Sequence, residues 1–199
     1  MSNPNKHRVI CTDFGATLDL GAVEKGNCSV DNHSVTCIFF VVSNWREVEY
    51  VNIKGNADKT ITNDCDKWIF FGDTISKGKK NDHVFHNTCL DYVVDYYDGE
   101  RERAGCEKIP MNILHTDNCA GQYKCRQNFL KLTTFTDRHP GTYAQHKFAQ
   151  KFKFKGPWDA TGKIVKEAIE NCELQYKRCA NAIDCYNYLR PCHTLELSH

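Results

Sequence analysis

The order in which strand-like and helix-like segments follow one another constrains the fold of this chain more than any single residue does. Three segments rich in β-branched and aromatic residues come first, at residues 7–15, 35–44 and 47–55. The middle segment, VTCIFFVVSN, is apolar almost throughout, which is typical of a central strand. Residues 44–46 predict a tight link to the third segment, so we expect the three strands to form an antiparallel meander.

Helix-like and strand-like segments alternate over the rest of the chain. Apolar spacing predicts a helix over residues 83–97, and residues 110–117 return to a strand. A helix, a strand and a last helix are then predicted over residues 120–132, 142–149 and 160–176. This succession is similar to the ribonuclease H-like arrangement. We therefore expect an α/β fold whose mixed five-stranded sheet, three antiparallel strands followed by alternating helices and strands, is flanked by helices.

Length and composition suit a single α/β domain. The 199 residues can bury one core, so we place a ribonuclease H-like domain at residues 1–170 and a helical, cysteine-rich extension at residues 171–199. The chain contains no apolar run of 18 residues, and its first residues lack the apolar stretch of a signal peptide. We expect an intracellular protein without a membrane partner.

Twelve cysteines leave two interpretations open. Several fall in apolar strands or on helical faces, which favours reduced thiols that pack as small hydrophobic side chains. The alternative is a zinc site at the C-terminal end, formed by Cys172, Cys179, Cys185 and Cys192 and followed by His193. No CxxC pair occurs, and steps of six or seven residues also match one face of a helix.

Three aspartates are the candidate catalytic and metal-ligating residues. Asp13 and Asp117 end the first and fourth predicted strands, and right-handed crossovers would make these strand ends neighbours. Asp159 begins the last predicted helix. Three carboxylates suit a pair of Mg²⁺ or Mn²⁺ ions that activates a water or hydroxyl for phosphodiester chemistry. Aspartate at such positions is also a common turn former or helix cap, and Glu167 and Asp73 are alternative ligands.

Basic and amide side chains near these aspartates suit a polyanion. The net charge is only +1, so the global field does not indicate nucleic acid. Lysines nevertheless crowd around Asp159, at positions Lys147, Lys151, Lys153, Lys155, Lys163 and Lys166. Near Asp117, a predicted helix N-terminus and the side chains of Asn118, Gln122 and Lys124 offer donors to a phosphate or base edge. A solvated lysine face and local capping are the plainer alternatives.

Two segments resemble a known family. TDNCAGQYK at residues 116–124 and KGPWDATGKIVK at residues 155–166 are similar to segments of eukaryotic transposon-derived proteins with a DDE-type transposase or integrase catalytic domain. That family shows the patterns DG-C-xx-Q-[YF]-K and KGPxDGxGG-x-[VI]-K. TDFG at residues 12–15 resembles its opening D-F-[AG] segment, so the resemblance spans residues 8–169. Asp117 and Asp159 are 42 residues apart, close to the spacing expected between the second and third acids.

The resemblance implies a nuclear enzyme that acts on DNA. Asp13, Asp117 and Asp159 would bind Mg²⁺ or Mn²⁺ for endonucleolytic cleavage and strand transfer of transposon ends or target DNA, and a second copy of the chain is a further candidate partner. Asn118, Ala160 and Lys163 replace glycines of the family patterns. Since no upstream DNA-binding domain is apparent, the alternative is a catalytically silent, domesticated or truncated transposase remnant that binds nucleic acid.

Overall fold

The protein is a mixed α/β structure built on one mixed sheet. The computed structural model describes residues 6–20, 33–51, 57–74, 83–119, 122–149, 157–174, 179 and 181–190. Its strands are β1 (His7–Leu20), β2 (His33–Val51), β3 (Ala57–Thr74), β4 (Met111–Thr116) and β5 (Tyr143–Phe148). Its helices are α1 (His83–Arg103), α2 (Arg126–Thr133), α3 (Phe135–Arg138), α4 (Pro157–Leu174) and α5 (Ala182–Leu189).

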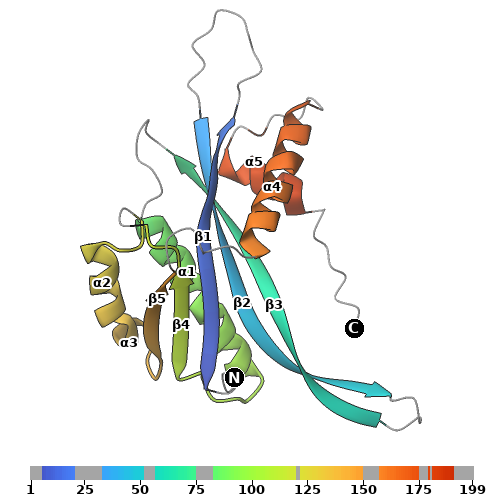
Figure 1. Cartoon of the computed structure of the whole chain (residues 1–199), viewed down its shortest axis with the longest axis vertical. Coiled ribbons are helices and arrows are strands. Elements are labelled where there is room, and N and C mark those ends of the chain that lie inside the picture. Colours follow the sequence, from blue (N-terminus) through green and yellow to red (C-terminus); the bar gives the residue numbers. More distant parts are fainter. Residues whose placement is uncertain are drawn as a thin grey trace, which may run out of the picture. The chain divides into compact units, whose positions relative to one another are not determined.

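The strands follow the order β3-β2-β1-β4-β5 across the sheet (Figure 1). β1 pairs with β4, and β4 pairs with β5, both in parallel. Figure 1 shows β2 running opposite to β1 and β3. The prediction of an α/β protein with a mixed sheet is therefore confirmed.

The chain divides into two compact units, and β1, β2 and β3 each supply residues to both. The first unit takes the described residues within Met1–Thr12, Phe40–Trp68 and Asn87–Phe154. The second takes those within Asp13–Phe39, Ile69–His86 and Lys155–His199. The boundary predicted between residues 170 and 171 falls inside α4, which lies wholly in the second unit.

The predicted turn at residues 44–46 is wrong, because β2 runs through it without a break. Residues 35–42 are all buried, as the continuous apolar run requires. The sequence from 43 to 51 contains no glycine or proline to end the strand, so extended backbone continues. The third strand comes instead from Ala57–Thr74, which includes the apolar stretch KWIFFGDT.

A buried ion pair organises the first unit. Arg8 of β1 contacts Asp98 of α1 at 2.9 Å (Nη2 to Oδ1), and both side chains are almost fully buried. The same guanidinium donates to Asn112 of β4 at 3.2 Å and lies over the Tyr97 ring. Burial lowers the pKa of Arg8, and the Asp98 carboxylate opposes this shift. Three elements therefore meet at one charged group that none of them could bury alone.

A second ionic cluster attaches α2 and α3 to α1. The Asp91 carboxylate accepts hydrogen bonds from Lys131 at 2.8 Å, from Arg138 at 3.2 Å and from His139 at 3.1 Å. The other ring nitrogen of His139 lies 3.0 Å from Asp95. Burial of Asp91 disfavours its charge, but these hydrogen bonds outweigh burial and hold the pKa of Asp91 well below its ordinary value.

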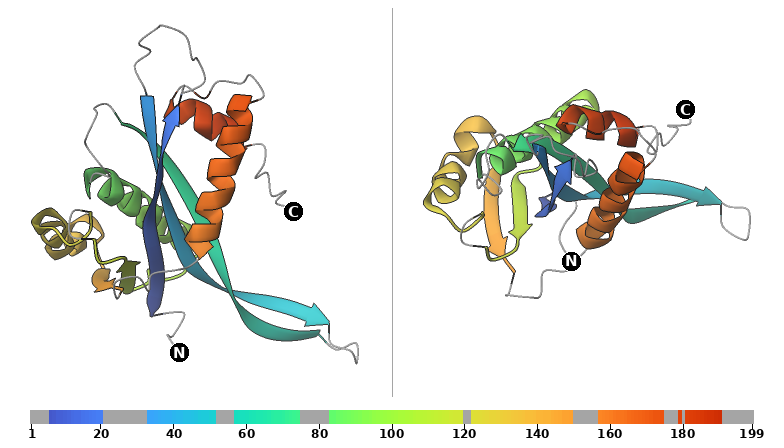
Figure 2. Two further views of the ribbon diagram at one scale, coloured as in Figure 1. Left: turned by 45° about the horizontal axis from the view of Figure 1, so that its top comes forward. Right: turned by 90° about the horizontal axis from the view of Figure 1, so that it is seen from above.

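The second unit depends on a close approach between β1 and β2. A β-carbon at Gly15 would collide with the side chains of Cys37 and Phe39, so only glycine fits there. In the same unit α4 contacts α5 (Figure 2). The N-terminus of α5 is held from two sides, because Asp73 accepts from the Ala182 N–H at 2.7 Å and Asn181 caps the helix through Asp184 N.

We predict that Gly15→Ala destabilises the protein and that Gly99→Ala does not. The first substitution forces Phe39 or Cys37 to move, which costs about 1–3 kcal/mol. Gly99 lies within α1 with its nearest crowding atom 4.0 Å away, so alanine there should gain about 0.5–1 kcal/mol. Urea denaturation of the two variants measures the difference. Equal stability of both would contradict the close approach.

The Asp91 cluster predicts a loss of stability in acid. Because the folded pKa of Asp91 lies below its ordinary value of 3.8, its contribution is complete above that pH and is lost as the pH falls below it. Asp91→Asn should cost about 1–3 kcal/mol at pH 7 and should flatten the stability profile below about pH 4. Denaturation curves recorded between pH 7 and pH 3 test this. An unchanged acid slope in the variant would refute the assignment.

Candidate functional site

Asp117 stands where the sequence predicts it, directly after β4. The side chains of Asn112, Leu114 and Thr116 alternate into the core, which fixes the strand and its end. Asp117 is half-buried, and its Oδ1 accepts the backbone N–H of Cys119 at 2.9 Å. This local turn orients the carboxylate at the strand end.

The helix predicted from residue 120 begins later than expected. The Cys119 carbonyl accepts from the backbone of Tyr123 at 3.0 Å and of Lys124 at 3.1 Å, so the segment forms a turn. Cys125 has extended backbone, and α2 starts at Arg126. The prediction of a helix N-terminus beside Asp117 is therefore wrong, because the Asp117 carboxylate and the Cys119 carbonyl take the local N–H groups into a turn.

The three predicted donors near Asp117 have separate roles. The exposed Lys124 ammonium donates to the Asn118 side chain at 3.2 Å. Gln122 is half-buried, and its backbone carbonyl accepts from Asn128 at 2.7 Å. Asn118 and Lys124 thus form an exposed polar pair next to Asp117, whereas Gln122 contributes to the turn.

Asp13 lies inside β1 and not at its end, since the strand continues to Leu20. Its side chain is half-buried. The parallel register pairs Cys11 of β1 with His115 of β4. Asp13 and Asp117 each come two positions after a member of that pair, so they have the same offset from it.

Asp159 is the third residue of α4, and its side chain is exposed. Pro157 occupies the first helical position, where the missing N–H costs nothing. A carboxylate in the first turn stabilises the helix by interacting with its dipole, whether or not it also binds a metal. Of the alternative ligands, Glu167 lies 3.6 Å from Lys163, and Asp73 holds the start of α5.

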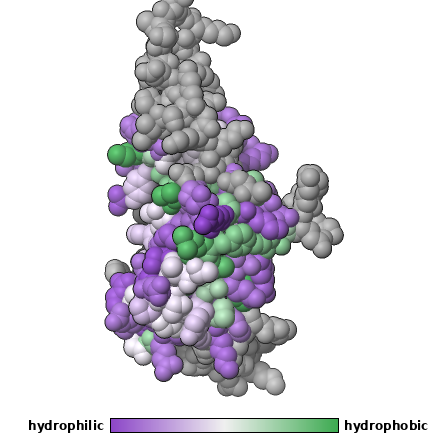
Figure 3. Space-filling model, turned by 90° about the vertical axis from the view of Figure 1, so that its left-hand side faces the viewer, coloured by the Kyte–Doolittle hydropathy of each residue, from purple (hydrophilic) through white to green (hydrophobic). Residues whose placement is uncertain are grey.

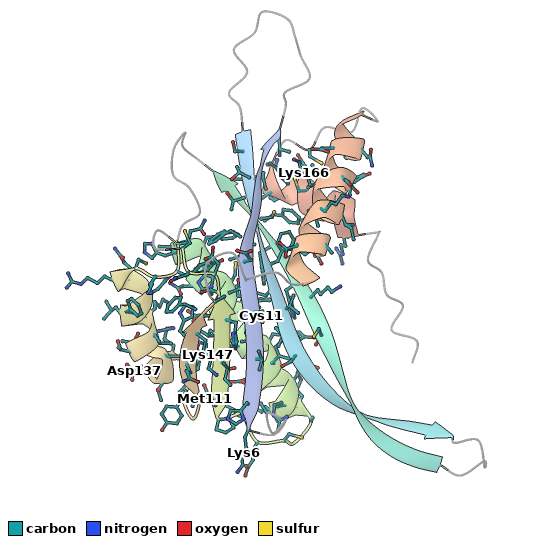
Figure 4. All side chains as sticks on the ribbon, in the orientation of Figure 1. Lys6, Cys11, Met111, Asp137, Lys147 and Lys166 are labelled. Atoms are coloured by element: carbon teal, nitrogen blue, oxygen red, sulfur yellow. The ribbon has the colours of Figure 1, made fainter. Side chains whose placement is uncertain are left out.

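The lysines of α4 are matched by acids on the same helix. Lys163 faces Glu167 at 3.6 Å and Lys166 faces Glu170 at 3.7 Å, all four side chains being more than half exposed. Figure 4 labels Lys166 on this helix. The predicted contact Lys155 lies outside the described residues. The described lysines of this region therefore carry less uncompensated charge than their number suggests.

The described residues hold no ready-made metal centre. Among them, no three His, Cys, Asp or Glu side chains gather as a group that could hold an ion. Asp117 belongs to the first unit, whereas Asp13 and Asp159 belong to the second. As donors, the three carboxylates have the hard oxygen chemistry that Mg²⁺ and Mn²⁺ prefer.

Among the residues that the structure describes, no cysteine forms a disulfide. Cys172, Cys179 and Cys185 are buried, and the sulfurs of the first two lie 3.4 Å apart. Burial raises the pKa of Cys185 to about 11, which keeps a neutral thiol at pH 7. Cys192 and His193, which the zinc alternative needs, lie outside the described residues.

A histidine beside Asp117, His146, is the feature that the sequence analysis missed. His146 Nε2 lies 2.9 Å from Thr116 Oγ1, and the same hydroxyl donates to the Asp117 carbonyl. Burial, followed by the influence of His115, lowers the pKa of His146 to about 4. The signal was the period-two pattern of YAQHKF, which places alternate residues on one face of β5.

The described helices also include none that is long and apolar enough to span a membrane.

We predict that His146 stays neutral until the solution is strongly acidic. Since its folded pKa is lower than the ordinary value of 6.5, the unfolded chain binds the proton first, and stability falls as the pH drops from about 6.5 to about 4. The cost should be at most about 3 kcal/mol. An NMR titration of the His146 ring should give a midpoint near pH 4. A midpoint near pH 6.5 would show that the ring is hydrated.

Comparison with known proteins assigns no family to this arrangement. No protein-family model matches the chain, and no curated protein matches it. The resemblance to DDE-type proteins therefore rests on the short segments around Asp13, Asp117 and Asp159.

Proposed function

We propose that this protein is a DDE-type, transposase-like polynucleotidyl transferase or endonuclease with a ribonuclease H-like fold. It would cleave or join DNA with Mg²⁺ or Mn²⁺ and would act in the nucleus. The observation that carries the proposal is the parallel register of β1 and β4, in which Asp13 and Asp117 share one offset from the Cys11–His115 pair. Equal offsets on neighbouring parallel strands suit two ligands of one metal pair.

The strand order supports the same proposal. A sheet ordered β3-β2-β1-β4-β5, with β1 at its centre and β4 parallel to it, is the arrangement expected of ribonuclease H-like domains. The family-like segments also occur in the expected order along the chain, around Asp13, then Asp117, then Asp159. The strand order and the order of these segments agree, which supports the proposal.

The proposed mechanism assigns each aspartate a position in metal binding. Asp13, Asp117 and Asp159 would together hold the ions through their carboxylate oxygens. Bound ions would lower the pKa of an attacking water and stabilise the leaving oxygen. The chain itself orients Asp117, because the Cys119 N–H holds Oδ1 and thereby fixes the direction of Oδ2. The neutral His146 ring beside Thr116 adds no positive charge next to this carboxylate.

The second candidate is a catalytically silent nucleic-acid-binding remnant. Two observations favour it. Asp159 is exposed on the first turn of α4, where it already suits the helix. The described residues also contain no group of three ligands arranged to hold an ion.

The proposal predicts that turnover depends on the aspartates. With Mg²⁺ or Mn²⁺ and labelled duplex DNA, Asp13→Asn, Asp117→Asn and Asp159→Asn should each lower cleavage or strand transfer by at least about 100-fold, since even outer partners of a metal site cost about 10–100-fold. Asparagine keeps the Oδ1 acceptor that the turn at Asp117 needs, so the fold should survive.

Two further variants sharpen this test. Asp137→Asn, an exposed acid on α3, should leave activity unchanged. Glu167→Gln should also leave it unchanged if Asp159 is the third ligand, and an inactive Glu167→Gln with an active Asp159→Asn would reverse that assignment. DNA binding without any metal-dependent turnover in the wild type would favour the silent remnant.

A further inference from the structure

Helix α2 exposes two of its apolar side chains and buries a polar one. Asn128 is 5% exposed, whereas Phe129 is 44% exposed and Leu130 is 66% exposed. A surface helix normally turns such residues toward the core. This inverted pattern of burial needs a physical cause, and it indicates that the exposed face of α2 could bind a partner.

The cause is a satisfied hydrogen-bond network around Asn128. Its side-chain amide donates to the carbonyls of Gln122 at 2.7 Å and Tyr123 at 3.0 Å. Its carbonyl oxygen accepts from Asn87 of α1 at 2.8 Å. Rotating α2 to bury Phe129 would break all three bonds and leave buried polar groups unpaired, which costs more than the burial would return. The network therefore holds Phe129 toward solvent.

Phe129 belongs to a cluster of rings that reaches the Asp117 turn. Its ring meets that of Phe148 edge to face, with centroids 6.2 Å apart. Phe148 also contacts His146 at 4.2 Å, and the Lys124 ammonium lies 5.3 Å from its ring centre. Lys124 in turn donates to Asn118, the residue after Asp117. A continuous set of contacts thus joins the exposed ring to the strand end.

The surroundings of this ring are basic. Lys124 and Arg126 are exposed, whereas Lys147 alternates with Phe148 along β5 and points to the other face of the sheet. Between residues 118 and 149 the sequence contains one acid, Asp137. Lys147 on β5 and Asp137 on α3 are both labelled in Figure 4. Figure 3 shows the side of the molecule that is on the left of Figure 1, where hydrophobic side chains interrupt a largely hydrophilic surface.

We propose that the exposed face of α2 binds single-stranded nucleic acid, with an unpaired base stacked on Phe129 and phosphates near Lys124 and Arg126. Aromatic rings set among cations suit an unpaired strand, because every base has a face that can stack and every nucleotide carries a phosphate. A duplex hides these base faces. The inference rests on the proposed function only for placing the strand beside Asp117, since the binding itself needs no metal.

Fluorescence anisotropy with a labelled single-stranded DNA oligonucleotide, in a chelator, tests the inference. Phe129→Ala should weaken binding about tenfold, the usual effect of losing one stacked base. Phe129→Trp should bind as well as the wild type, and Phe129→Leu should bind as weakly as Phe129→Ala because it keeps an apolar side chain without a ring. Tyr92→Ala removes a ring of α1 that is 56% exposed and should change nothing. Raising the salt concentration should weaken binding less in Lys124→Gln than in the wild type.

Three results would overturn the inference. The first is wild-type protein that does not bind the single strand. The second is a Phe129→Leu variant that binds as well as the wild type, which would indicate general apolar contact. The third is a Phe129→Ala variant that binds DNA normally but changes the sedimentation coefficient, which would assign the face to a second copy of the chain. Binding that depends on the Phe129 ring, without any DNA turnover, would uphold this inference and refute the proposed enzyme. Turnover that is lost in Asp117→Asn, together with unchanged DNA binding by Phe129→Ala, would uphold the proposed enzyme and refute this inference.

Discussion

The buried ion pair between Arg8 and Asp98 is the interaction on which the first unit depends. It joins the first strand to α1, and through Asn112 it reaches the fourth strand, so it ties together the pieces that position Asp117. Replacing one member would leave a charge buried without its partner, which is far more costly than replacing both. The pair thus specifies which strand lies beside which helix. Apolar contacts are less selective, because one apolar side chain can replace another.

The fold was predictable where the hydrophobic pattern was strong. A continuous apolar run predicts the buried strand at residues 35–42, and alternation of apolar and polar residues predicts β4. Apolar residues at helical spacing predict α1. The errors concern boundaries and the third strand, which was predicted at residues 47–55 and lies at Ala57–Thr74. The pattern at residues 44–46 permits either a turn or continued strand, and only the pairing of the neighbouring strands decides between them. The late start of α2 depends on the Asp117 turn, a side-chain interaction that helix propensity does not represent.

The candidate site was predictable to a lesser degree. Predicted strand ends identified Asp117 and Asp13, although Asp13 lies inside β1, and the predicted start of the last helix identified Asp159. The role of Asn128 could not be inferred, because its partners lie on another helix and on a turn that is separate in sequence. For the same reason the exposure of Phe129 was not foreseen: an apolar residue in a helical pattern is expected to face the core, and a polar network overrides that tendency here.

The pairing of β1 with β4 also has a consequence for how the chain is made. Arg8 and its strand partner Asn112 are 104 positions apart, so β1 emerges from the ribosome long before its parallel neighbour exists. During that interval β4 is not yet available to pair with β1, so one edge of β1 and the apolar run of β2 beside it stay uncovered. Sheets whose strands pair over such long sequence separations fold slowly and pass through aggregation-prone intermediates. Production of this protein should therefore respond strongly to the speed of translation and to chaperones that shield nascent strands.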